Sequence, residues 1–499
     1  MKIKFIAEIL VLCLMFFSLA SCASPGEPEN AENAASTGPQ GDQSQKQASE
    51  TARALPDVPT IDCGGHEFKI LTFAEQGNPV HDHPDLTWRE ENMGEILNDA
   101  VYERNMAIEE RFNVKIMEIH STDSANDLRK AVTSQSDMYD LVGQRMVLAY
   151  GPITNGYYMN LHALPNLDLA KPWYIQSSVE NLTVGGKLFT VYSEMLVSPY
   201  CAAAAIVFNK KLHSEHGLPD PYQMVRDGEW TIDALYDMCK VGSKDLNGDG
   251  AMTYEDDQWG FMTPTDAMAG FLFGGGGSMG SFQSDGSFEF RLASEKSVSI
   301  LDKAFQILYD KNLTINMHAV NHGKSSINTA MDIMWIDGRA AFAWTRIGNI
   351  RLWREMDIPF GILPMPKYDA AQEKYCSVIT PWQAMGTCIP VTATDIDRTT
   401  IILEAISAES RYTLQPAYFE VTLKMKQARD EESAEMLEYI FGNTVIDAAM
   451  TYNFGGMAEG FLNLGWAYNP NIQSFYEKCL PSAERDIEKL IEFIGNLDN

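Results

Sequence analysis

The chain has 499 residues, of which 45% are hydrophobic and 21% charged, and its formal net charge is -30. This length predicts roughly two to four domains, and the apolar content is enough for full-sized cores, which excludes a disordered or fibrous chain. So acidic a protein repels phosphate backbones and anionic lipid headgroups. We therefore expect no nucleic-acid partner and no folded face lying on a membrane.

The first residues have the pattern of a secretory signal peptide. Lys2 and Lys4 precede an apolar run at 9–17, which is shorter than the about 20 apolar residues that span a bilayer. The sequence LASC (19–22) follows, and this order resembles a bacterial lipoprotein signal in which the cysteine is acylated. A signal peptide that ends beside a cysteine by chance is the alternative. We expect removal of residues 1–21 and lipidation of Cys22, which would hold the protein outside the cytoplasmic membrane.

Residues 22–61 form the next predicted segment, a lipidated flexible tether. They are rich in Ser, Glu, Gln, Asn, Pro and Ala and have almost no large apolar side chains. Such a composition cannot bury enough surface to offset the entropy lost on ordering.

Strands and helices alternate in the first part of the body. An apolar strand at 67–72 is followed by a helix at about 93–112, a strand at 114–119, a helix at 127–134 and a strand at 139–142. This alternation predicts a mainly parallel sheet covered by helices.

The middle of the chain contains a second set of elements, and the last third is mostly helical. The continuous apolar run at 202–208 reads as a strand, Thr231 as the N-cap of a helix that reaches about Val241, and 294–310 as an amphipathic helix. Further strands are expected at 340–344 and 360–363, and further helices at 396–410, 413–426, 433–441 and 483–494.

Six cysteines remain once Cys13 leaves with the signal and Cys22 is acylated, and they have no zinc-ligand spacing. Cys201 and Cys239 lie in apolar surroundings and are expected to be buried thiols. A disulfide framework is not expected, although the sequence leaves open whether Cys376 pairs with Cys388.

Several stretches after the tether resemble the extracellular solute-binding proteins of bacterial ABC importers, in particular the family 1, carbohydrate-type group of lipoproteins. They are NDAVYERN (98–105), EERFNV (109–114), VFNKKL (207–212), VRDGEWT (225–231), GRAAF (338–342), FGILPMPK (360–367) and DEESAEML (430–437). The resemblance covers essentially the whole body.

This resemblance implies an α/β, two-lobed periplasmic-binding-protein-like fold of type II, with discontinuous lobes joined by crossing strands. The first crossing would fall near 200–208 and the return near 378–390. Lobe 1 would then comprise residues 62–200 and 378–412, and lobe 2 residues 201–377 and 413–499.

One loop has the spacing of an EF-hand calcium site. Its predicted ligands fill positions 1, 3, 5, 7, 9 and 12, with Gly250 at position 6, and they are Asp245, Asn247, Asp249, Ala251 through its carbonyl, Thr253 and Asp256. Position 12 is Asp rather than the usual Glu, and no second helix follows. We expect a structural Ca²⁺ clip, the alternative being an Asx-rich turn without an ion.

The glycine-rich stretch at 274–280 matches both G-x-G-x-x-G and G-x-S-x-G. Either motif needs a strand before it and a helix after it. A turn is expected at 281–286 instead, so we interpret the stretch as a flexible loop rather than as a nucleotide site or as a catalytic site at Ser278.

Aromatic residues are the remaining candidates for ligand contact, because sugars stack their C–H faces on aromatic rings. A place in the core is the alternative for each tryptophan. The predicted ligand-binding residues are Trp173, Tyr174, Trp382, Trp344, Arg346 and Trp88.

The resemblance implies a lipid-anchored, extracytoplasmic and monomeric receptor. It would capture a small solute between two lobes, an oligosaccharide in our interpretation, and deliver it unchanged to the membrane subunits of an ABC permease. No catalytic residues are expected. The alternatives are a surface-anchored carbohydrate-active enzyme, or the same fold binding a peptide or another metabolite.

Overall fold

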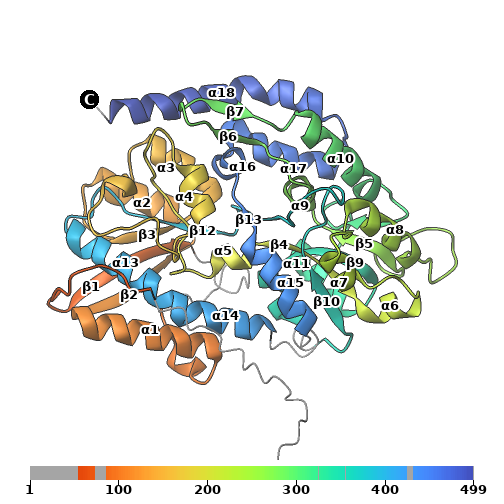
Figure 1. Cartoon of the computed structure of the whole chain (residues 1–499), viewed down its shortest axis with the longest axis horizontal. Helices are drawn as coiled ribbons and strands as arrows, with labels where there is room; N and C mark the ends of the chain where they lie inside the picture. Colours follow the sequence, from red (N-terminus) through yellow and green to blue (C-terminus); the bar gives the residue numbers. More distant parts are fainter. Residues whose placement is uncertain (1–53, 74–85, 324, 354–355, 424–430, 498–499) are drawn as a thin grey trace, which may run out of the picture. The chain divides into compact units, whose positions relative to one another are not determined.

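Two large β-sheets organise the part of the chain that the computed structural model describes, which is residues 54–73, 86–323, 325–353, 356–423 and 431–497 (Figure 1). The predicted signal peptide, the lipidation site Cys22 and residues 22–53 of the predicted tether lie outside these described residues. Residues 54–61 of the predicted tether are described. The amide N–H of Ala54 donates to the hydroxyl of Tyr412 at 2.7 Å, and Ala54, Val58 and Ile61 are partly buried against the core.

The first sheet has four strands in the order β12-β3-β1-β2. β1 (His66–Phe73) pairs in parallel with β2 (Val114–Ser121) and with β3 (Leu141–Arg145), and β12 (Met385–Cys388) adds an antiparallel edge. The predicted strands at 67–72 and 114–119 and the parallel pairing are confirmed, whereas the strand predicted at 139–142 begins two residues later, at Leu141, and runs to Arg145. Phe68 and Ile70 point to one face of β1 and Leu71 to the other, and all three are buried, so both faces of the strand are covered.

The second sheet has five strands in the order β10-β4-β9-β5-β8. β9 (Ala340–Arg346), β5 (Trp259–Thr263) and β8 (Thr314–Asn316) are parallel to one another, whereas β4 (Ala204–Asn209) and β10 (Phe360–Leu363) are antiparallel to their neighbours. The sequence predicted β4, β9 and β10 but not β5 or β8. β8 has only three residues, and β5 begins at Trp259, two residues after the polar loop at 245–257.

Two small sheets complete the strands among the described residues. β6 (Gly280–Phe282) and β7 (Phe288–Phe290) form a hairpin, so that the turn expected at 281–286 begins later, after β6. β11 (Ser377–Val378) pairs in parallel with β13 (Thr444–Val445).

Helices cover both large sheets. Those up to the start of the second sheet are α1 (Ile96–Phe112), α2 (Ser124–Thr133), α3 (Tyr150–Thr154), α4 (Gln176–Leu182) and α5 (Ser198–Cys201). Those within the second sheet's part of the chain are α6 (Lys210–Glu215), α7 (Pro221–Arg226), α8 (Ile232–Gly242), α9 (Ala267–Gly274), α10 (Glu295–Leu308), α11 (Ile327–Ile336) and α12 (Ile347–Ile350). The remaining helices are α13 (Ile396–Tyr412), α14 (Leu414–Leu423), α15 (Glu431–Gly442), α16 (Ala448–Tyr452), α17 (Met457–Ala467) and α18 (Ile472–Asn496).

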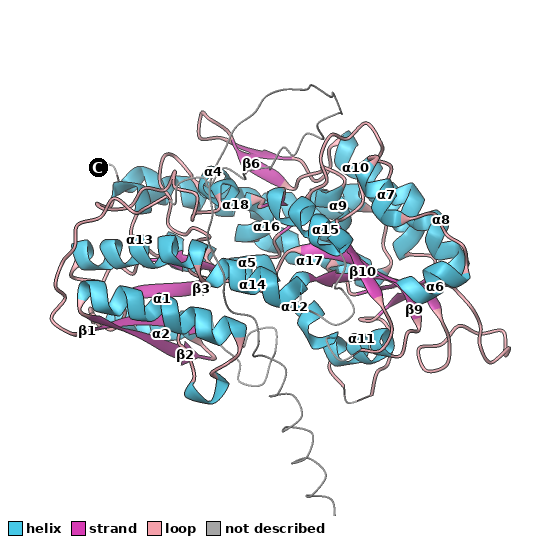
Figure 2. Cartoon of the chain, turned by 60° about the horizontal axis from the view of Figure 1, so that its bottom comes forward, coloured by secondary structure: helices cyan, strands magenta, loops and turns pink. Residues whose placement is uncertain are grey.

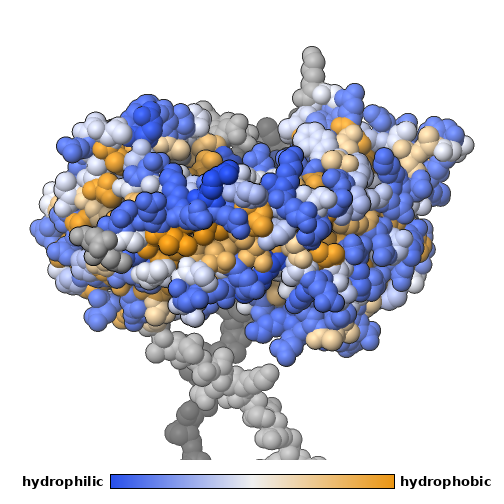
Figure 3. All heavy atoms as spheres, turned by 90° about the horizontal axis from the view of Figure 1, so that it is seen from above, coloured by the Kyte–Doolittle hydropathy of each residue, from blue (hydrophilic) through white to orange (hydrophobic). Residues whose placement is uncertain are grey.

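The helices divide between the sheets. Figure 2 shows α1, α2 and α13 beside β1, β2 and β3, and α6 and α11 near β9 and β10. α14 packs on α1 and α13, and α15 packs on β10. α18 is longer than the predicted helix at 483–494. Seen from the α18 side, the surface is mostly hydrophilic, with apolar residues gathered in a band (Figure 3).

Three chain segments run side by side where the chain passes between the sheets. The amide N–H of Thr380 donates to the carbonyl of Ala202 at 3.1 Å, and that of Ile379 donates to the carbonyl of Val445 at 3.1 Å. Residues near the two predicted crossings, at 202–204 and 377–380, are therefore hydrogen-bonded, and β13 is a third segment that the sequence did not indicate. The exact lobe boundaries stay a prediction.

Side-chain caps explain where several helices begin. Thr231 accepts from the amide of Ala234 at the start of α8, as predicted, and Ser294 accepts from that of Ser297 at the start of α10. Such caps satisfy N–H groups that have no partner within the helix.

The glycine-rich stretch at 274–280 is held by a buried acid. Asp447 accepts hydrogen bonds from the hydroxyl of Ser278 at 2.7 Å and from the amides of Met279 and Gly280 at 2.9 and 3.2 Å, and it also caps α16 through the amide of Met450. Burial raises the pKa of Asp447, and these hydrogen bonds oppose that shift. Ser278 is thus bound to a helix-capping acid rather than to a catalytic base.

None of the six cysteines among the described residues forms a disulfide, and Cys201, Cys239 and Cys388 are buried. Within the described ranges, no helix combines the length and the apolar character that crossing a membrane requires.

Candidate ligand-binding cavity

A cavity of about 350 Å³ lies at the carboxyl ends of the three parallel strands of the second sheet. Pro264 directly follows β5, His318 follows β8 by two residues, and Arg346 is the last residue of β9. Because parallel strands all end at the same edge of a sheet, residues far apart in the sequence meet there. This edge is where open α/β sheets place their ligands.

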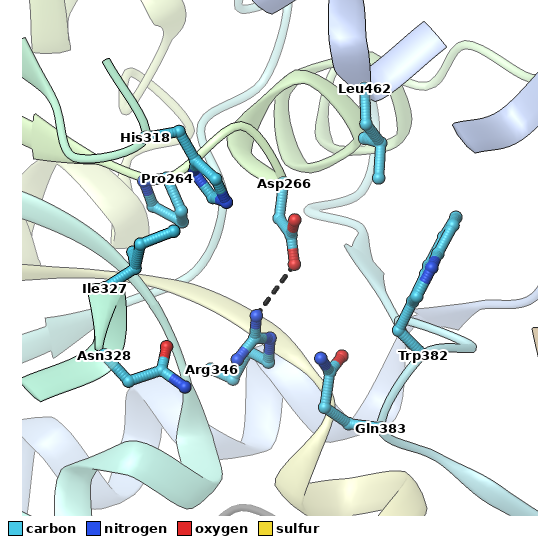
Figure 4. Close-up of a pocket in the computed structure, with 9 residues that line it drawn as sticks. All are labelled: Pro264, Asp266, His318, Ile327, Asn328, Arg346, Trp382, Gln383 and Leu462. Atoms are coloured by element: carbon cyan, nitrogen blue, oxygen red, sulfur yellow. Dashed lines mark hydrogen bonds and ion pairs between the residues drawn. The ribbon is translucent and has the colours of Figure 1, made fainter. Parts of the chain in front are cut away.

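The other walls come from elements outside the parallel strands. Ile327 and Asn328 begin α11, Leu462 comes from α17, and Trp382 and Gln383 lie in the segment between β11 and β12. Figure 4 shows Trp382 and His318 on opposite sides of the space around Asp266. The cavity is therefore lined both by the second sheet and by the segment that returns to the first.

An ion pair lies at the centre of the cavity. Nη2 of Arg346 donates to Oδ2 of Asp266 at 2.8 Å, and the two side chains are 9% and 16% exposed. The Nε of Arg346 is buried without a hydrogen-bond partner. The guanidinium also lies 5.5 Å from the centre of the Trp344 ring, a cation–π distance. Arg346 is thus fixed from two sides, by Asp266 and by the Trp344 ring.

His318 is held as a neutral ring. Its Nδ1 accepts from the amide of Thr265 at 3.1 Å, which places the proton of the neutral form on Nε2. Burial lowers the pKa of His318, and the Asp266 carboxylate opposes this shift while Arg346 reinforces it. With Asp266 and Arg346 paired, the lining has no net charge at neutral pH, in contrast to the acidic chain as a whole.

Trp382 and Gln383 are anchored through their neighbours. Nε of Arg145, at the end of β3, donates to the carbonyl of Trp382 at 3.0 Å, and the hydroxyl of Thr380 donates to Oε1 of Gln383 at 2.6 Å. The amide NH₂ of Gln383 is then the group it can offer to a ligand. The ring of Trp382 is only partly buried, so one apolar surface remains available.

The lining can bind a polar, uncharged molecule but has no catalytic set. Arg346, Gln383 and Asn328 supply donors, Asp266 and Asn328 supply acceptors, and Trp382 supplies a flat apolar surface. The nine lining residues include one carboxylate, whereas glycoside hydrolysis uses two. They also include no Ser, Cys or Thr that could act as a nucleophile.

The structure brings together only some of the predicted ligand-binding residues. Arg346 and Trp382 line the cavity, and Trp344 lies beneath Arg346 with 1% of its surface exposed. Trp173 and Tyr174 are in the core, where they have almost no surface for a sugar to stack on, and the Tyr174 hydroxyl donates to Glu404 at 2.6 Å. Trp88 is 39% exposed, packs edge-on against Tyr102 and does not line the cavity.

Sequence reasoning did not identify Asp266, His318, Asn328 or Gln383. Asp266 and His318 follow β5 and β8, the two strands that the sequence did not predict, so the rule that ligands bind at strand ends could not be applied to them. Gln383 is adjacent to Trp382 and could have been found by extending the same prediction by one residue.

A second cavity, of about 430 Å³, lies between the turn at Gly185-Gly186 and the turn of the β6–β7 hairpin. Its lining contains two carboxylates, Glu180 and Asp285, and no cationic side chain. It is formed by surface turns rather than by the ends of parallel strands. The cavity at Arg346 is therefore the stronger candidate for a solute site.

The predicted calcium loop lies between α8 and β5, and the bridge between Lys244 and Gln258 closes it. Asp245 accepts from the amides of Gly248 and Gly250 at 2.6 and 2.8 Å, and Nδ2 of Asn247 donates to Asp249 at 3.1 Å. These three side chains are therefore gathered as positions 1, 3 and 5 of a cation loop require.

The far end of this loop is organised differently. Asp257, not Asp256, turns inward and accepts from the amides of Leu246 and Thr253 at 2.9 and 2.7 Å, hydrogen bonds that lower its pKa. Among the described residues, no three His, Cys, Asp or Glu side chains come together as a metal site. The three acids of the predicted ligand set, Asp245, Asp249 and Asp256, are therefore not gathered into one such group, and the remaining predicted ligands are an amide, a hydroxyl and a main-chain carbonyl.

No protein-family model and no curated protein matches the sequence. Solved structures do match its fold. An ABC substrate-binding protein of Listeria monocytogenes, Lmo0181, in complex with cycloalternan is 13% identical with a TM-score of 0.52, and the match covers 86% of this chain and 100% of that one. The GacH receptor of Streptomyces glaucescens, described unliganded and with acarbose, is 13% identical with a TM-score of 0.52 over 85% and 98% of the two chains.

A cyclo/maltodextrin-binding protein complexed with maltotetraose is 14% identical with a TM-score of 0.53, and the match covers 86% of this chain and 99% of that one. Near-complete coverage at low identity means that the overall fold is shared although few residues are identical. The chain therefore has the α/β, type II periplasmic-binding-protein-like fold of ABC substrate-binding proteins, as its sequence predicted.

Proposed function

We propose that the protein is the solute receptor of an ABC importer and that it binds a neutral oligosaccharide in the cavity at Arg346. The observation that carries this proposal is the placement of a partly exposed Trp382 opposite a paired Asp266 and Arg346 at the carboxyl ends of parallel strands. A sugar has an apolar C–H face for the ring and hydroxyl groups that both donate to Asp266 and accept from Arg346. The similar structures in complex with cycloalternan, acarbose or maltotetraose support the same class of ligand.

Hinge closure is the proposed mechanism. The cavity is lined both by the second sheet and by the returning segment at Trp382, so a bound solute contacts both and stabilises the closed arrangement. The closed receptor would be the form that the permease recognises, and the solute would be released unchanged.

The test is a thermal-shift screen with neutral saccharides, acidic saccharides and peptides, followed by calorimetry. A ligand at 100 times its dissociation constant adds about 2.7 kcal/mol to the free energy of unfolding, which is a readily measured rise in melting temperature. We expect neutral oligosaccharides to stabilise the protein and Arg346→Gln and Trp382→Ala to weaken binding at least tenfold, or about 1.4 kcal/mol.

Two other results would contradict the proposal. Stabilisation by peptides alone would show that the ligand class is wrong. New reducing ends after incubation with a glycan panel would mean a carbohydrate-active enzyme, the alternative that the single carboxylate in the lining disfavours.

We propose further that Cys22 carries a lipid anchor and that the protein is an extracytoplasmic monomer beside its permease. The apolar run followed by LASC supports this proposal. Mass spectrometry of the mature N-terminus should find an acylated Cys22, and Cys22→Ser should release the protein from the membrane fraction. A mature chain that begins at any other residue would refute it.

For the loop at 245–256 we propose a structural Ca²⁺. The convergence of Asp245, Asn247 and Asp249 and the all-oxygen donor set support a hard cation. The ion would neutralise these carboxylates and join α8 to β5. Calcium should raise the melting temperature of the wild type but not of Asp249→Ala, whereas Asp285→Ala, in the β6–β7 turn, should respond like the wild type. A wild type that takes up no calcium in calorimetry would leave the loop as an Asx-rich turn.

A further inference from the structure

One large aromatic side chain beside the cavity is exposed to solvent, and the packing of the core does not explain this exposure. Trp466, in the last turn of α17, is 53% exposed. Its ring centre lies 5.6 Å from that of His318, which lines the cavity, and the two rings are inclined at 49°. Leu462, four residues earlier and so on the same side of α17, lines the cavity as well. Trp466 therefore lies next to the cavity without lining it.

Fraying of the helix end does not account for this exposure. The side-chain amide of Asn316 donates to the carbonyl of Gly465 at 3.1 Å, and the hydroxyl of Tyr309 donates to the carbonyls of Leu464 and Asn469, both at 3.1 Å. A Cβ at Gly465 would lie 2.9 Å from Cγ of Met268, so α17 packs closely on α9 at this point. The backbone on both sides of Trp466 is held by the second sheet and its helices.

A rigidly held, half-exposed indole suits the binding of a sugar ring. Such a platform orders no flexible segment when a ligand arrives, and its flat apolar face complements the C–H face of a pyranose. The adjacent His318 is neutral and has its Nε2 proton available as a donor to a hydroxyl group. Trp382 lies on the other side of the cavity from His318 (Figure 4), so the two tryptophans mark separate positions along a ligand.

We infer that Trp466 forms a second sugar subsite, adjoining the one at Trp382, and that the ligand spans at least two sugar units. This inference rests on the proposed function and deepens it, because it assigns the length of the ligand. A saccharide that fills only the space around Arg346 does not reach Trp466, whereas a longer one extends past His318 onto it. Trp466 thus selects for chain length.

The test measures dissociation constants for a series of increasing length of the saccharide found in the screen, with the wild type, Trp466→Ala, Trp466→Phe and the control Ile491→Ala. Ile491 is also a large exposed apolar residue, at 41%, but it lies on α18. We expect Trp466→Ala to weaken binding of the longer members about tenfold, the size of one aromatic contact, and to leave the shortest member within about twofold. Trp466→Phe should restore most of the affinity, and Ile491→Ala should match the wild type.

Fluorescence gives a second measurement that does not depend on affinity. Acrylamide should quench the exposed Trp466, and a saturating long saccharide should protect it while the shortest member does not. In the Trp466→Ala protein the long and the short members should protect equally, because only the ring of Trp382 is then covered. The melting temperature of this variant should equal that of the wild type because the side chain is mostly outside the core.

The possible failures are distinguishable. If Trp466→Ala binds every length as the wild type does, while Trp382→Ala does not, Trp466 is not a subsite and the proposed function stands. If Trp466→Ala weakens all lengths equally, the assignment of chain length is wrong. If no saccharide binds the wild type, both the proposed function and the subsite are refuted.

Discussion

Oδ2 of Asp266 lies 2.8 Å from Nη2 of Arg346, although the two residues are 80 positions apart in the chain. Asp266 follows β5 and Arg346 ends β9, and the parallel pairing of these strands brings them to the same edge of the sheet. The pair neutralises the centre of the cavity within a strongly acidic protein. It also orients the Arg346 guanidinium, which lines the cavity.

Replacing Asp266 by Asn should destabilise the protein and weaken ligand binding. The change removes the negative partner of a guanidinium that is only 9% exposed, and an unpaired charge in such a site is poorly solvated. Because Asp266 itself is partly exposed, we expect a loss of about 2–3 kcal/mol in the free energy of unfolding, measured by urea denaturation.

The control for this variant is Glu289→Gln. It breaks the ion pair of Glu289 with Arg291, whose side chains are 55% and 38% exposed, and should cost less than about 1 kcal/mol. Equal effects of the two substitutions would mean that burial does not strengthen the pair at Arg346.

Glu404 should make the stability fall as the pH rises towards neutrality. Burial raises its pKa from an ordinary 4.5 to about 7, while the hydrogen bond from Tyr174 opposes the shift. The folded protein therefore holds a proton that the unfolded chain releases between about pH 4.5 and 7. This contribution is complete below pH 4.5 and is lost as the pH rises through 7.

The Glu404→Gln variant keeps the shape and a hydrogen bond to Tyr174 but does not titrate. Its unfolding free energy should vary less between pH 5 and 8 and should exceed that of the wild type at pH 8, by a few kcal/mol at most. Burial also raises the pKa of Glu194 to about 7, against the effect of Arg411, so some pH dependence should remain. The control is Glu110→Gln, at an exposed position. If the unfolding free energy of Glu404→Gln varied with pH in the same way as that of Glu110→Gln, Glu404 would not be the source of the pH dependence.

Gly270 should be intolerant of a side chain. A Cβ there would clash with Nε1 of Trp344 and lie 3.0 Å from Cε of Met365. Gly270→Ala should cost about 1–3 kcal/mol through overpacking, and it should weaken saccharide binding because Trp344 supports Arg346. Gly151→Ala, at a helical glycine with no atom within 4 Å of the added Cβ, should be neutral or slightly stabilising.

Removing the Asp447 carboxylate should detach the glycine-rich stretch from α16. Asp447→Ala leaves the buried amides of Met279, Gly280 and Met450 without their acceptor, so we expect a loss of about 3 kcal/mol or more in urea denaturation. Asn471→Ala, which removes the exposed single-bond cap of α18, should cost only about 1 kcal/mol. Similar losses in the two variants would mean that Asp447 acts only as a helix cap.

The sequence by itself determined the elements whose pattern is local. The continuous apolar run at 202–208 identified β4, the cap residue Thr231 identified the start of α8, and amphipathic periodicity identified α10. The alternation of strands and helices predicted a parallel first sheet. Each of these signals depends on neighbouring residues along the chain, which is why a single sequence contains it.

Only the tertiary structure decided which side chains meet. Trp173, Tyr174, Trp344, Trp382 and Trp466 are alike as aromatic residues in the sequence, yet the first three are buried, Trp382 lines the cavity and Trp466 is exposed beside it. Burial depends on contacts between segments hundreds of residues apart, such as Tyr174 with Glu404, and these contacts leave no periodic pattern. The ion pair of Asp266 with Arg346 likewise exists only because β5 and β9 end at one edge of the same sheet.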